Sequence, residues 1–268
     1  MLLLLSPAKN LDFSPAPATL PATKPALSKD AAEIAAVAKN LTPGDLKRLM
    51  GISDKLATLN HARFQAWKAR GKPAEAKQAA LAFNGEVYLG LDAKTLTEDD
   101  FAFAQDHVRI LSGLYGLLRP LDVIQPYRLE MGRSLKNPRG ANLYAFWGDR
   151  IAKEARKAAK AQTDPTVVNL ASAEYFKAVD QDALKLPIVT PQFLDEKGGK
   201  LRSLMFFAKR ARGEMARWAI QHRVETAEDL KRYDGPMGYR FRPDLSSEAK
   251  WVFARKQPAL KAAAKKAA

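Results

Sequence analysis

The segment Leu46–Asn60, LKRLMGISDKLATLN, has the residue types and spacing of a module that binds a phosphate group. It resembles a helix-hairpin-helix, in which a short turn presents the N-terminus of its second helix to a nucleic-acid backbone. Unpaired N–H groups and the positive end of the helix dipole meet at that N-terminus, and both attract an anion. We expect the module within residues 42–67, with the phosphate at the turn Gly51–Ser53.

The hairpin needs small and apolar residues at defined positions. The apolar positions and the narrow position of the second helix are filled by Leu46, Leu49, Ile52 and Ala57. Gly51 permits a tight turn, because glycine tolerates a positive φ. Ser53 stands where the motif normally has a second glycine. Its hydroxyl can cap the second helix or donate to a phosphate oxygen.

Cationic side chains surround this turn, namely Lys47, Arg48 and Lys55. An ordinary helical hairpin packed on a core has a similar pattern, so the charge of the whole chain matters. The chain has 44 Lys and Arg residues against 29 Asp and Glu residues, a formal net charge of +15 and a pI of about 9.9. Such an excess favours polyanions as partners. Residues 256–268 are rich in lysine and alanine, and we expect them to form a flexible basic tail.

Cysteine is absent from the sequence, which excludes several kinds of chemistry. Disulfides, thiolate metal sites, cysteine-bound iron–sulfur clusters and peroxide reduction by a thiol all require it. The three histidines, His61, His107 and His222, show no metal-ligand spacing. We therefore predict no metal and no cofactor. The apolar start Met1–Leu5 is too short to cross a membrane and lacks the features of a signal peptide, so we expect a soluble, cytoplasmic protein.

Known catalytic signatures are incomplete. Ser6–Lys9 has a serine–lysine spacing, but the other elements of penicillin-binding enzymes are missing. Pro243-Asp244 followed by Glu248-Ala-Lys250 imitates the signature of a metal-dependent nuclease, yet only three residues separate its halves. There is no P-loop and no dinucleotide-binding fingerprint. We assign no catalytic residue and expect a protein that is not an enzyme.

Hydrophobic periodicity indicates a mixed α/β protein. Strands are expected at 1–5, 107–112 and 166–171, near 238–241 and 251–254, and in a hairpin of 187–194 with 201–207. One helix is expected to begin with Ser28 as its cap, and another is expected to include Phe64 and Trp67. Further helices are expected from 73 to about 83, over 147–161 and over 208–222. This alternation is too irregular for a doubly wound sheet. We predict one compact α/β domain, residues 1–255, with a mixed sheet surrounded by helices.

Two further regions have the composition of a binding surface. Ser112–Arg133 combines turn residues, aromatic residues and arginines, and its prolines forbid a continuous helix. The helix expected over 208–222 has a packing face, Phe207, Ala211, Met215, Trp218 and His222, and a strongly cationic remainder. Such a helix suits the wall of a phosphate-binding cleft, although a solvated basic face has the same pattern.

Several long blocks closely resemble the YaaA family of bacterial peroxide-stress proteins. These blocks are Ser6–Phe13, Phe83–Ala93, Arg109–Gly132, Asn137–Ile151, Val168–Val179 and Phe207–Trp218. The resemblance extends from the first residue to about Arg255. It implies an uncommon single-domain α/β fold with an embedded helix-hairpin-helix beside a positively charged cleft. It also implies binding to duplex or structurally distorted DNA and a role during exposure to peroxide.

The resemblance places the hairpin at Leu46–Ala57. By charge and by membership of the matching blocks, we assign Lys9, Arg119, Arg128, Lys209 and Arg212 to the DNA-binding cleft. We expect weak sequence preference, a monomer and no membrane partner. Two alternatives stay open. An enzyme acting on DNA or on a phosphorylated small molecule would use residues such as Asp12, Glu86, Glu130, Glu174, Tyr115 and Lys9. A scaffold would offer its basic surface to an acidic protein.

Overall fold

The computed structural model describes residues 1–15 and 20–257. At its centre lies the strand β1, Leu2–Leu5, whose four leucines are fully buried. It pairs in parallel with β5, Val108–Ser112, on one side and with β8, Val167–Leu170, on the other. A parallel strand covered on both faces has an unbroken apolar sequence, and the strand expected at the start of the chain is confirmed.

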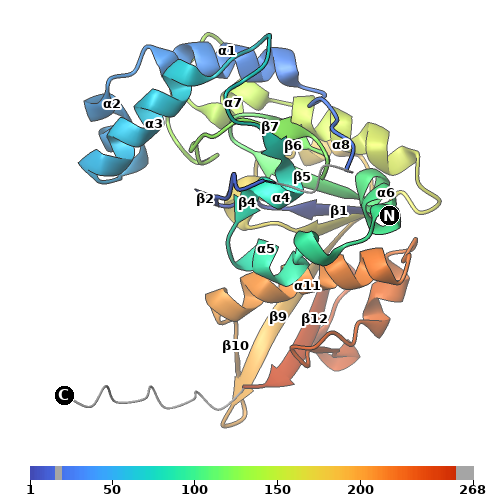
Figure 1. The fold of residues 1–268 in the computed structure, drawn as a ribbon. Coiled ribbons are helices and arrows are strands. Elements are labelled where there is room, and N and C mark those ends of the chain that lie inside the picture. Colours follow the sequence, from blue (N-terminus) through green and yellow to red (C-terminus); the bar gives the residue numbers. More distant parts are fainter. Residues whose placement is uncertain (16–19, 258–268) are drawn as a thin grey trace.

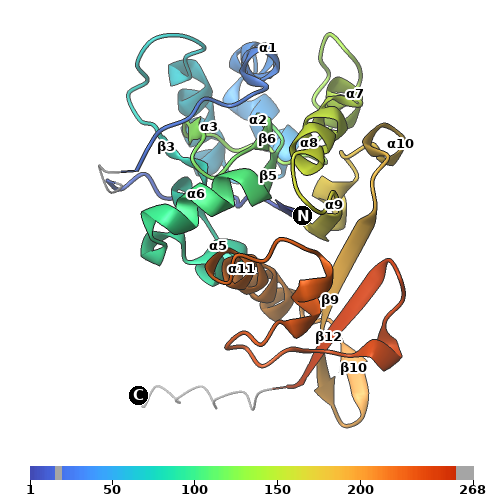
Figure 2. The same ribbon diagram turned by 90° about the vertical axis from the view of Figure 1, so that its right-hand side faces the viewer.

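The main sheet has eight strands and is mixed, as predicted. Its order is β11-β12-β9-β8-β1-β5-β6, and β10 also pairs with β9. The added strands are β6, Gly116–Leu118, β9, Ile188–Lys197, β10, Lys200–Arg202, β11, Arg240–Phe241, and β12, Lys250–Lys256. Only the start of β9 pairs with β8; its remainder continues outward and pairs with β12 and β10 (Figure 2). Two small ladders join β2, Asn10–Leu11, to β4, Phe83–Asn84, and β3, Lys77–Gln78, to β7, Val123–Ile124.

Helices cover the central strands from above and below in Figure 1. Below lie α5, Glu86–Leu91, and α11, Met205–Gln221; above lie α7, Leu143–Trp147, and α8, Arg150–Lys160. At the top are α1, Ser28–Lys39, α2, Pro43–Met50, and α3, Asp54–Ala66. The other helices are α4, Ala79–Ala82, α6, Glu98–His107, α9, Ala173–Phe176, and α10, Gln181–Leu184, with 3₁₀ turns at Ala93–Thr95, Glu228–Arg232 and Pro243–Leu245. Among the described residues, no helix is long and apolar enough to cross a membrane.

The predicted helix from 73 to about 83 is wrong. The chain forms the short strand β3, a single turn α4 and the short strand β4 there. Ala79 N–H donates to the Asp122 carbonyl at 2.9 Å, and Ala80 N–H donates to the Pro120 carbonyl at 3.0 Å. In a continuous helix, these two N–H groups would donate to carbonyls four residues earlier in the same helix. Here they donate to a distant segment, so tertiary pairing overrides the helical preference of the alanines.

Smaller differences concern the ends of elements. Helix α11 begins at Met205, three residues before its predicted start at 208. Ser28 is the first residue of α1 and its side chain does not cap that helix. Strand β12 ends at Lys256, where the basic tail was expected to begin. The rest of that predicted tail, from residue 258, lies outside the described residues.

Two glycines set the contact between α5 and α11. A Cβ on Gly213 would lie 1.7 Å from the Val87 carbonyl oxygen, and one on Gly90 would lie 2.1 Å from the Arg210 carbonyl oxygen. The helix backbones therefore approach more closely than any other residue would permit. This contact matters for function because it fixes the start of α11 relative to the loop before α5.

Replacing Gly213 with alanine is expected to destabilise the fold by about 3 kcal/mol or more, because the new methyl group would meet backbone atoms that cannot turn aside. Urea unfolding followed by circular dichroism measures the change. Gly44→Ala is the matched control, since its Cβ would meet its nearest atoms at 3.7 Å, an ordinary contact distance. That control should leave the stability unchanged or raise it slightly. A loss below about 1 kcal/mol for Gly213→Ala would contradict this account.

Candidate nucleic-acid interface

The candidate site begins where β1 and β8 end. Both strands run in the same direction, so the residues that follow them leave the sheet at one edge, where ligands commonly bind in parallel sheets. Ser6 follows β1 and Ser172 lies two residues beyond β8. The Ser172 N–H donates to Ser6 Oγ at 2.8 Å. A neighbouring loop is attached here as well, since the Gly132 N–H donates to Glu174 Oε1 at 2.9 Å.

One buried carboxylate gathers three cations at this edge. The Glu130 side chain is only 5% exposed, and its Oε1 lies 2.9 Å from Arg128 Nη2 and 3.6 Å from Lys9 Nζ. Arg133 Nε lies 3.7 Å from Glu130 Oε2. The Lys9 side chain is 62% exposed, so its ammonium can reach a ligand in solvent. Three positive charges share one negative charge, and the cluster therefore attracts anions.

Tyrosines line a recess together with residues of this cluster. Tyr127 and Tyr175 line a small recess together with residues 7–9 and 128–130. Burial raises the pKa of both phenols, so they stay neutral and do not offset the positive charge. Tyr127 Oη lies 2.6 Å from Ser112 Oγ, and Tyr88 donates to the Ser6 carbonyl at 3.0 Å. The first bond connects the recess to the end of β5, and the second holds the residue that follows β1.

A second cationic element is the hairpin of α2 and α3. Its turn is Gly51–Ser53, at the predicted position, and Gly51 adopts a φ of 63° that favours glycine. Leu46 and Ala57 are buried, as the pattern requires. The Ser53 hydroxyl accepts a hydrogen bond from the Leu56 N–H at 3.4 Å, which makes Ser53 the cap of α3. That this hairpin is a phosphate-binding helix-hairpin-helix stays a prediction.

The cations at the hairpin differ in their partners. Lys47 Nζ lies 2.9 Å from Asp54 Oδ2, and Arg48 pairs with Asp45. Lys55 has no ion pair within the described part of the chain. Exposed ion pairs contribute little to stability, so a phosphate can replace these carboxylates. The acids nevertheless reduce the charge that the hairpin offers to an anion.

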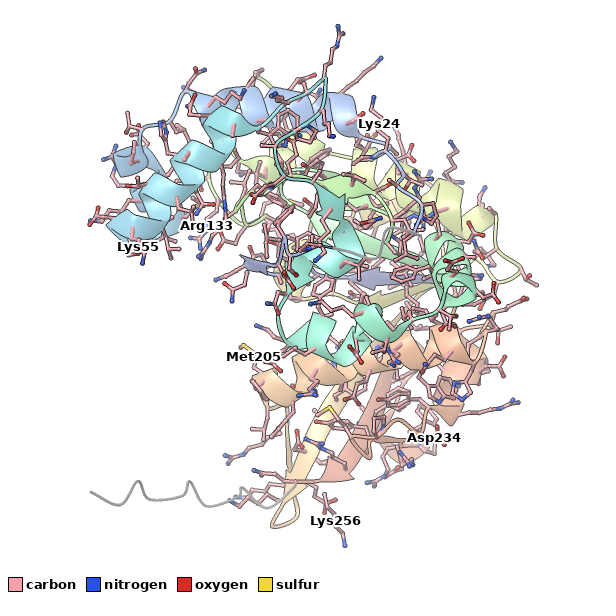
Figure 3. The ribbon with its side chains drawn as sticks, in the orientation of Figure 1. Lys24, Lys55, Arg133, Met205, Asp234 and Lys256 are labelled. Atoms are coloured by element: carbon pink, nitrogen blue, oxygen red, sulfur yellow. The ribbon has the colours of Figure 1, made fainter. Side chains whose placement is uncertain are left out.

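The remaining predicted cleft residues are not all brought together. Arg119 pairs with Asp122 at 2.9 Å and donates to the Lys24 carbonyl at 3.1 Å. In Figure 3, Lys24 lies at the upper right, far from Arg133 and Lys55 on the left. The structure therefore separates Arg119 from Lys9 and Arg128.

Lys209 and Arg212 lie on the first half of α11. Lys209 is exposed, whereas Arg212 is largely covered and its Nε has no hydrogen-bond partner among the described residues. Burial lowers the pKa of Arg212. Of the predicted packing face of this helix, Ala211 and Met215 are buried, Phe207 and Trp218 are half-buried, and His222 is exposed.

Sequence reasoning passed over Arg133 as a site residue. Its signal lies in the spacing Arg128-x-Glu130-x-x-Arg133, which places a cation on either side of one acid. In an irregular segment this spacing says little about geometry, because the backbone path decides which side chains meet. Only the folded loop shows that both arginines face the same carboxylate.

The residues proposed for an enzyme are only partly brought together, and Glu174 lies at the same sheet edge as Lys9 and Glu130. Lys9 and Glu130 share the recess, but Asp12 bonds to Lys94 at 2.8 Å and Tyr115 accepts a hydrogen bond from Trp67 at 3.0 Å. Burial raises the pKa of Tyr115 to about 12. The Asp244 of the nuclease-like segment pairs with Arg242 at 2.6 Å. Within residues 1–15 and 20–257, no group of three metal-ligating side chains is placed to hold an ion.

Asp12 gives a pH-dependent prediction for the loop that carries Lys9. Hydrogen bonds from Lys94 and Ser14 hold the pKa of Asp12 well below its usual range. A depressed pKa stabilises the fold above the unfolded value near 4 and loses its effect as the pH falls toward the folded value. Lys94→Met should therefore lower the free energy of unfolding by up to about 1 kcal/mol between pH 5 and 8, with the difference shrinking below pH 4.

Urea unfolding at pH 7, 5 and 3 tests this expectation. Lys160→Met is the control, because Lys160 is exposed on α8 and has no ion pair among the described residues. A difference between wild type and Lys94→Met that grows as the pH falls would contradict the assigned sign.

Comparison with known proteins identifies the family. The family model described as peroxide stress protein YaaA matches residues 1–245. A UPF0246 protein of Caulobacter vibrioides is 57% identical over 258 residues, which cover 96% of this chain and 100% of the relative. Relatives from Phenylobacterium zucineum, at 55% identity over 96% of both chains, and Maricaulis maris, at 53% over the full length of both, carry the same description. The chain therefore belongs to the YaaA family of peroxide stress proteins.

Proposed function

We propose that this protein acts in peroxide stress by binding DNA through the phosphate backbone. In this proposal a cytoplasmic monomer binds duplex or distorted DNA with weak sequence preference. The contacts come from the cluster around Glu130, from the α2–α3 hairpin and from the cations of α11. Nothing in the described elements resembles a recognition helix of the kind that reads the major groove.

The observation that carries the proposal is the charge imbalance at Glu130. Among the described residues, Glu130 supplies the only carboxylate within 4 Å of Lys9, Arg128 and Arg133, and its one negative charge does not neutralise three positive charges. Glu174 is the next acid at this edge, and the cations still outnumber the two acids. Two hydrogen bonds to this carboxylate orient Arg128 before a phosphate arrives, whereas Arg133 lies within ion-pair distance without a hydrogen bond to it. Figure 3 shows Arg133 on the same side of the molecule as Lys55 of the hairpin. A backbone that crosses this side would meet both cationic elements.

The absence of cysteine supports a mode of protection that acts through DNA. Peroxide reduction by proteins commonly depends on a thiolate, and this chain has no cysteine. The protein therefore cannot reduce peroxide with a thiol of its own. DNA binding, by contrast, uses the property that the sequence has in excess, which is positive charge.

The first test is a salt series with duplex DNA. If about five phosphates are neutralised, log K should fall with log salt at a slope of about −4 to −5. Lys9→Ala should weaken binding and make the slope of log K against log salt shallower by about one. Lys47→Ala/Lys55→Ala should weaken binding and make the same slope shallower by up to about two. Fluorescence anisotropy measures both quantities. Lys157→Ala/Lys160→Ala on α8 removes equal charge from exposed positions and should change binding less. Equal effects from the two double variants would mean that only net charge matters.

The second test addresses the turn of the hairpin. Gly51→Val should weaken DNA binding about tenfold or more, because a β-branched residue resists the positive φ and displaces the turn. Gly71→Val is the matched control, since Gly71 also has a positive φ of 81° and open space around its Cα. Both variants should be similarly destabilised. If Gly51→Val bound DNA as well as Gly71→Val did, the hairpin would have no part in binding.

One observation favours the second candidate function, an enzyme. Glu130 Oε2 is buried and has no hydrogen-bond partner among the described residues, and an exposed lysine lies beside the same carboxyl group. Such a pair can exchange a proton with a phosphorylated substrate. Incubation of DNA and nucleotides with wild type and with Glu130→Gln would show a product formed only by wild type.

A further inference from the structure

The two most exposed large apolar side chains of the described residues are neighbours. Met205 is 72% exposed and Phe206 is 56% exposed, and both belong to the first turn of α11. The expected helix began later, at 208, so sequence reasoning assigned these residues to a strand. Single exposed apolar residues are common on protein surfaces, but an adjacent pair that includes an aromatic ring calls for a partner.

The Phe206 ring is supported from beneath. It meets the Phe207 ring nearly edge-on, with centroids 5.6 Å apart. The Arg255 guanidinium lies 4.7 Å from the Phe207 centroid, and Arg255 Nε bonds to Asp195 Oδ1 at 2.7 Å. Asp195 and Arg255 are both buried side chains. The exposed Phe206 ring therefore contacts a ring that is itself packed against a buried ion pair.

Cations flank this apolar pair along the chain, although Arg210 lies 3.8 Å from Glu214 and Arg212 is largely covered. Residues 198–213 contain no acid, and their cations are Lys200, Arg202, Lys209, Arg210 and Arg212. Lys209 and Arg210 lie about one turn along α11 from Met205 and Phe206. A ligand with a flat apolar face and a negatively charged backbone matches this arrangement. Nucleic acid has that chemistry, because each base carries a phosphate.

The pair also belongs to the side on which we propose that DNA binds. In Figure 3, Met205 lies on the left of the molecule, as do Lys55 and Arg133. A strand that contacts the cluster around Glu130 can extend toward α11. Within a regular duplex both faces of each base are covered by neighbouring bases, so only an unstacked base offers a free face to Phe206.

We propose that Met205 and Phe206 form a stacking platform for a nucleobase that has left the duplex stack. The platform makes the protein prefer DNA with bulged or unpaired bases, while the surrounding cations hold the adjoining phosphates. This inference rests on the proposed DNA-binding function and adds a specificity determinant to it. Aromatic residues that stack on single bases act in this way with little dependence on base identity.

The experiment compares two DNA molecules that differ by one base. One is a fully paired duplex, and the other is the same duplex with a single bulged 2-aminopurine. Binding is measured by anisotropy and stacking by 2-aminopurine fluorescence. Wild type should prefer the bulged DNA and quench its fluorescence. Phe206→Ala should lose about tenfold in affinity for the bulged DNA and less than twofold for the duplex, because one stacking contact is removed.

Two matched variants complete the design. Phe206→Trp should restore the preference and the quenching, because tryptophan supplies a larger aromatic face. Leu245→Ala removes another exposed apolar residue, which is 39% exposed, and should leave both affinities unchanged. Thermal unfolding should be similar for all variants, since these side chains are exposed.

Each other outcome has a distinct meaning. If wild type bound both DNA molecules but Phe206→Ala kept the preference and the quenching, the platform would be wrong and DNA binding would stand. An equal loss for both DNA molecules would also overturn the platform. If wild type bound neither DNA, the proposed function itself would fail. Sedimentation with anionic vesicles is a separate measurement. If Phe206→Ala lost vesicle binding but kept the binding of wild type to both DNA molecules, the pair would bind a lipid surface and the inference would be overturned.

Discussion

Four leucines at the start of the chain, Leu2–Leu5, form a strand with no side facing solvent. Because β5 and β8 run parallel to this strand, the chain must leave the sheet at the edge where its neighbours also end. The loop Ser6–Lys9 therefore arrives beside the residues that follow β8, and the bond between Ser172 N–H and Ser6 Oγ joins the two exits. The candidate interface depends on this edge, since the loop that carries Glu130 is attached to it through Gly132 and Glu174.

A buried carboxylate has to be paired, because removing a charge from water is costly unless opposite charge compensates. Glu130 meets that requirement with two arginines and a lysine, and the surplus is positive. The pairing that allows Glu130 to be buried also places cations at the surface of the cluster. Stability and anion attraction thus arise from one arrangement. At the hairpin the balance is different, because Asp45 and Asp54 already accompany two of its three cations.

The outer part of the sheet serves a separate purpose. Strand β9 extends beyond β8 and pairs with β12, and this pairing brings Asp195 against Arg255 in the register of the two strands. Arg255 in turn covers Phe207, on which the exposed Phe206 rests. The close contact at Gly213 fixes the same helix against α5. A buried ion pair, an aromatic pair and a glycine contact together decide how the start of α11 faces solvent.

The sequence by itself determined the buried strand at Leu2–Leu5, the mixed α/β class, the turn at Gly51 and the excess of positive charge, because each depends on local residue type, spacing or composition. It did not determine the path of residues 77–84, where hydrogen bonds from Ala79 and Ala80 to distant carbonyls replace the expected helix. It also could not place Lys9, Arg128 and Arg133 around Glu130 or separate them from Arg119. The contact of Lys9 with Glu130 joins segments more than a hundred residues apart, and the packing of the parallel strands decides that these two loops meet. The arginines are close to Glu130 in sequence, but the irregular path of the loop decides which of them face it.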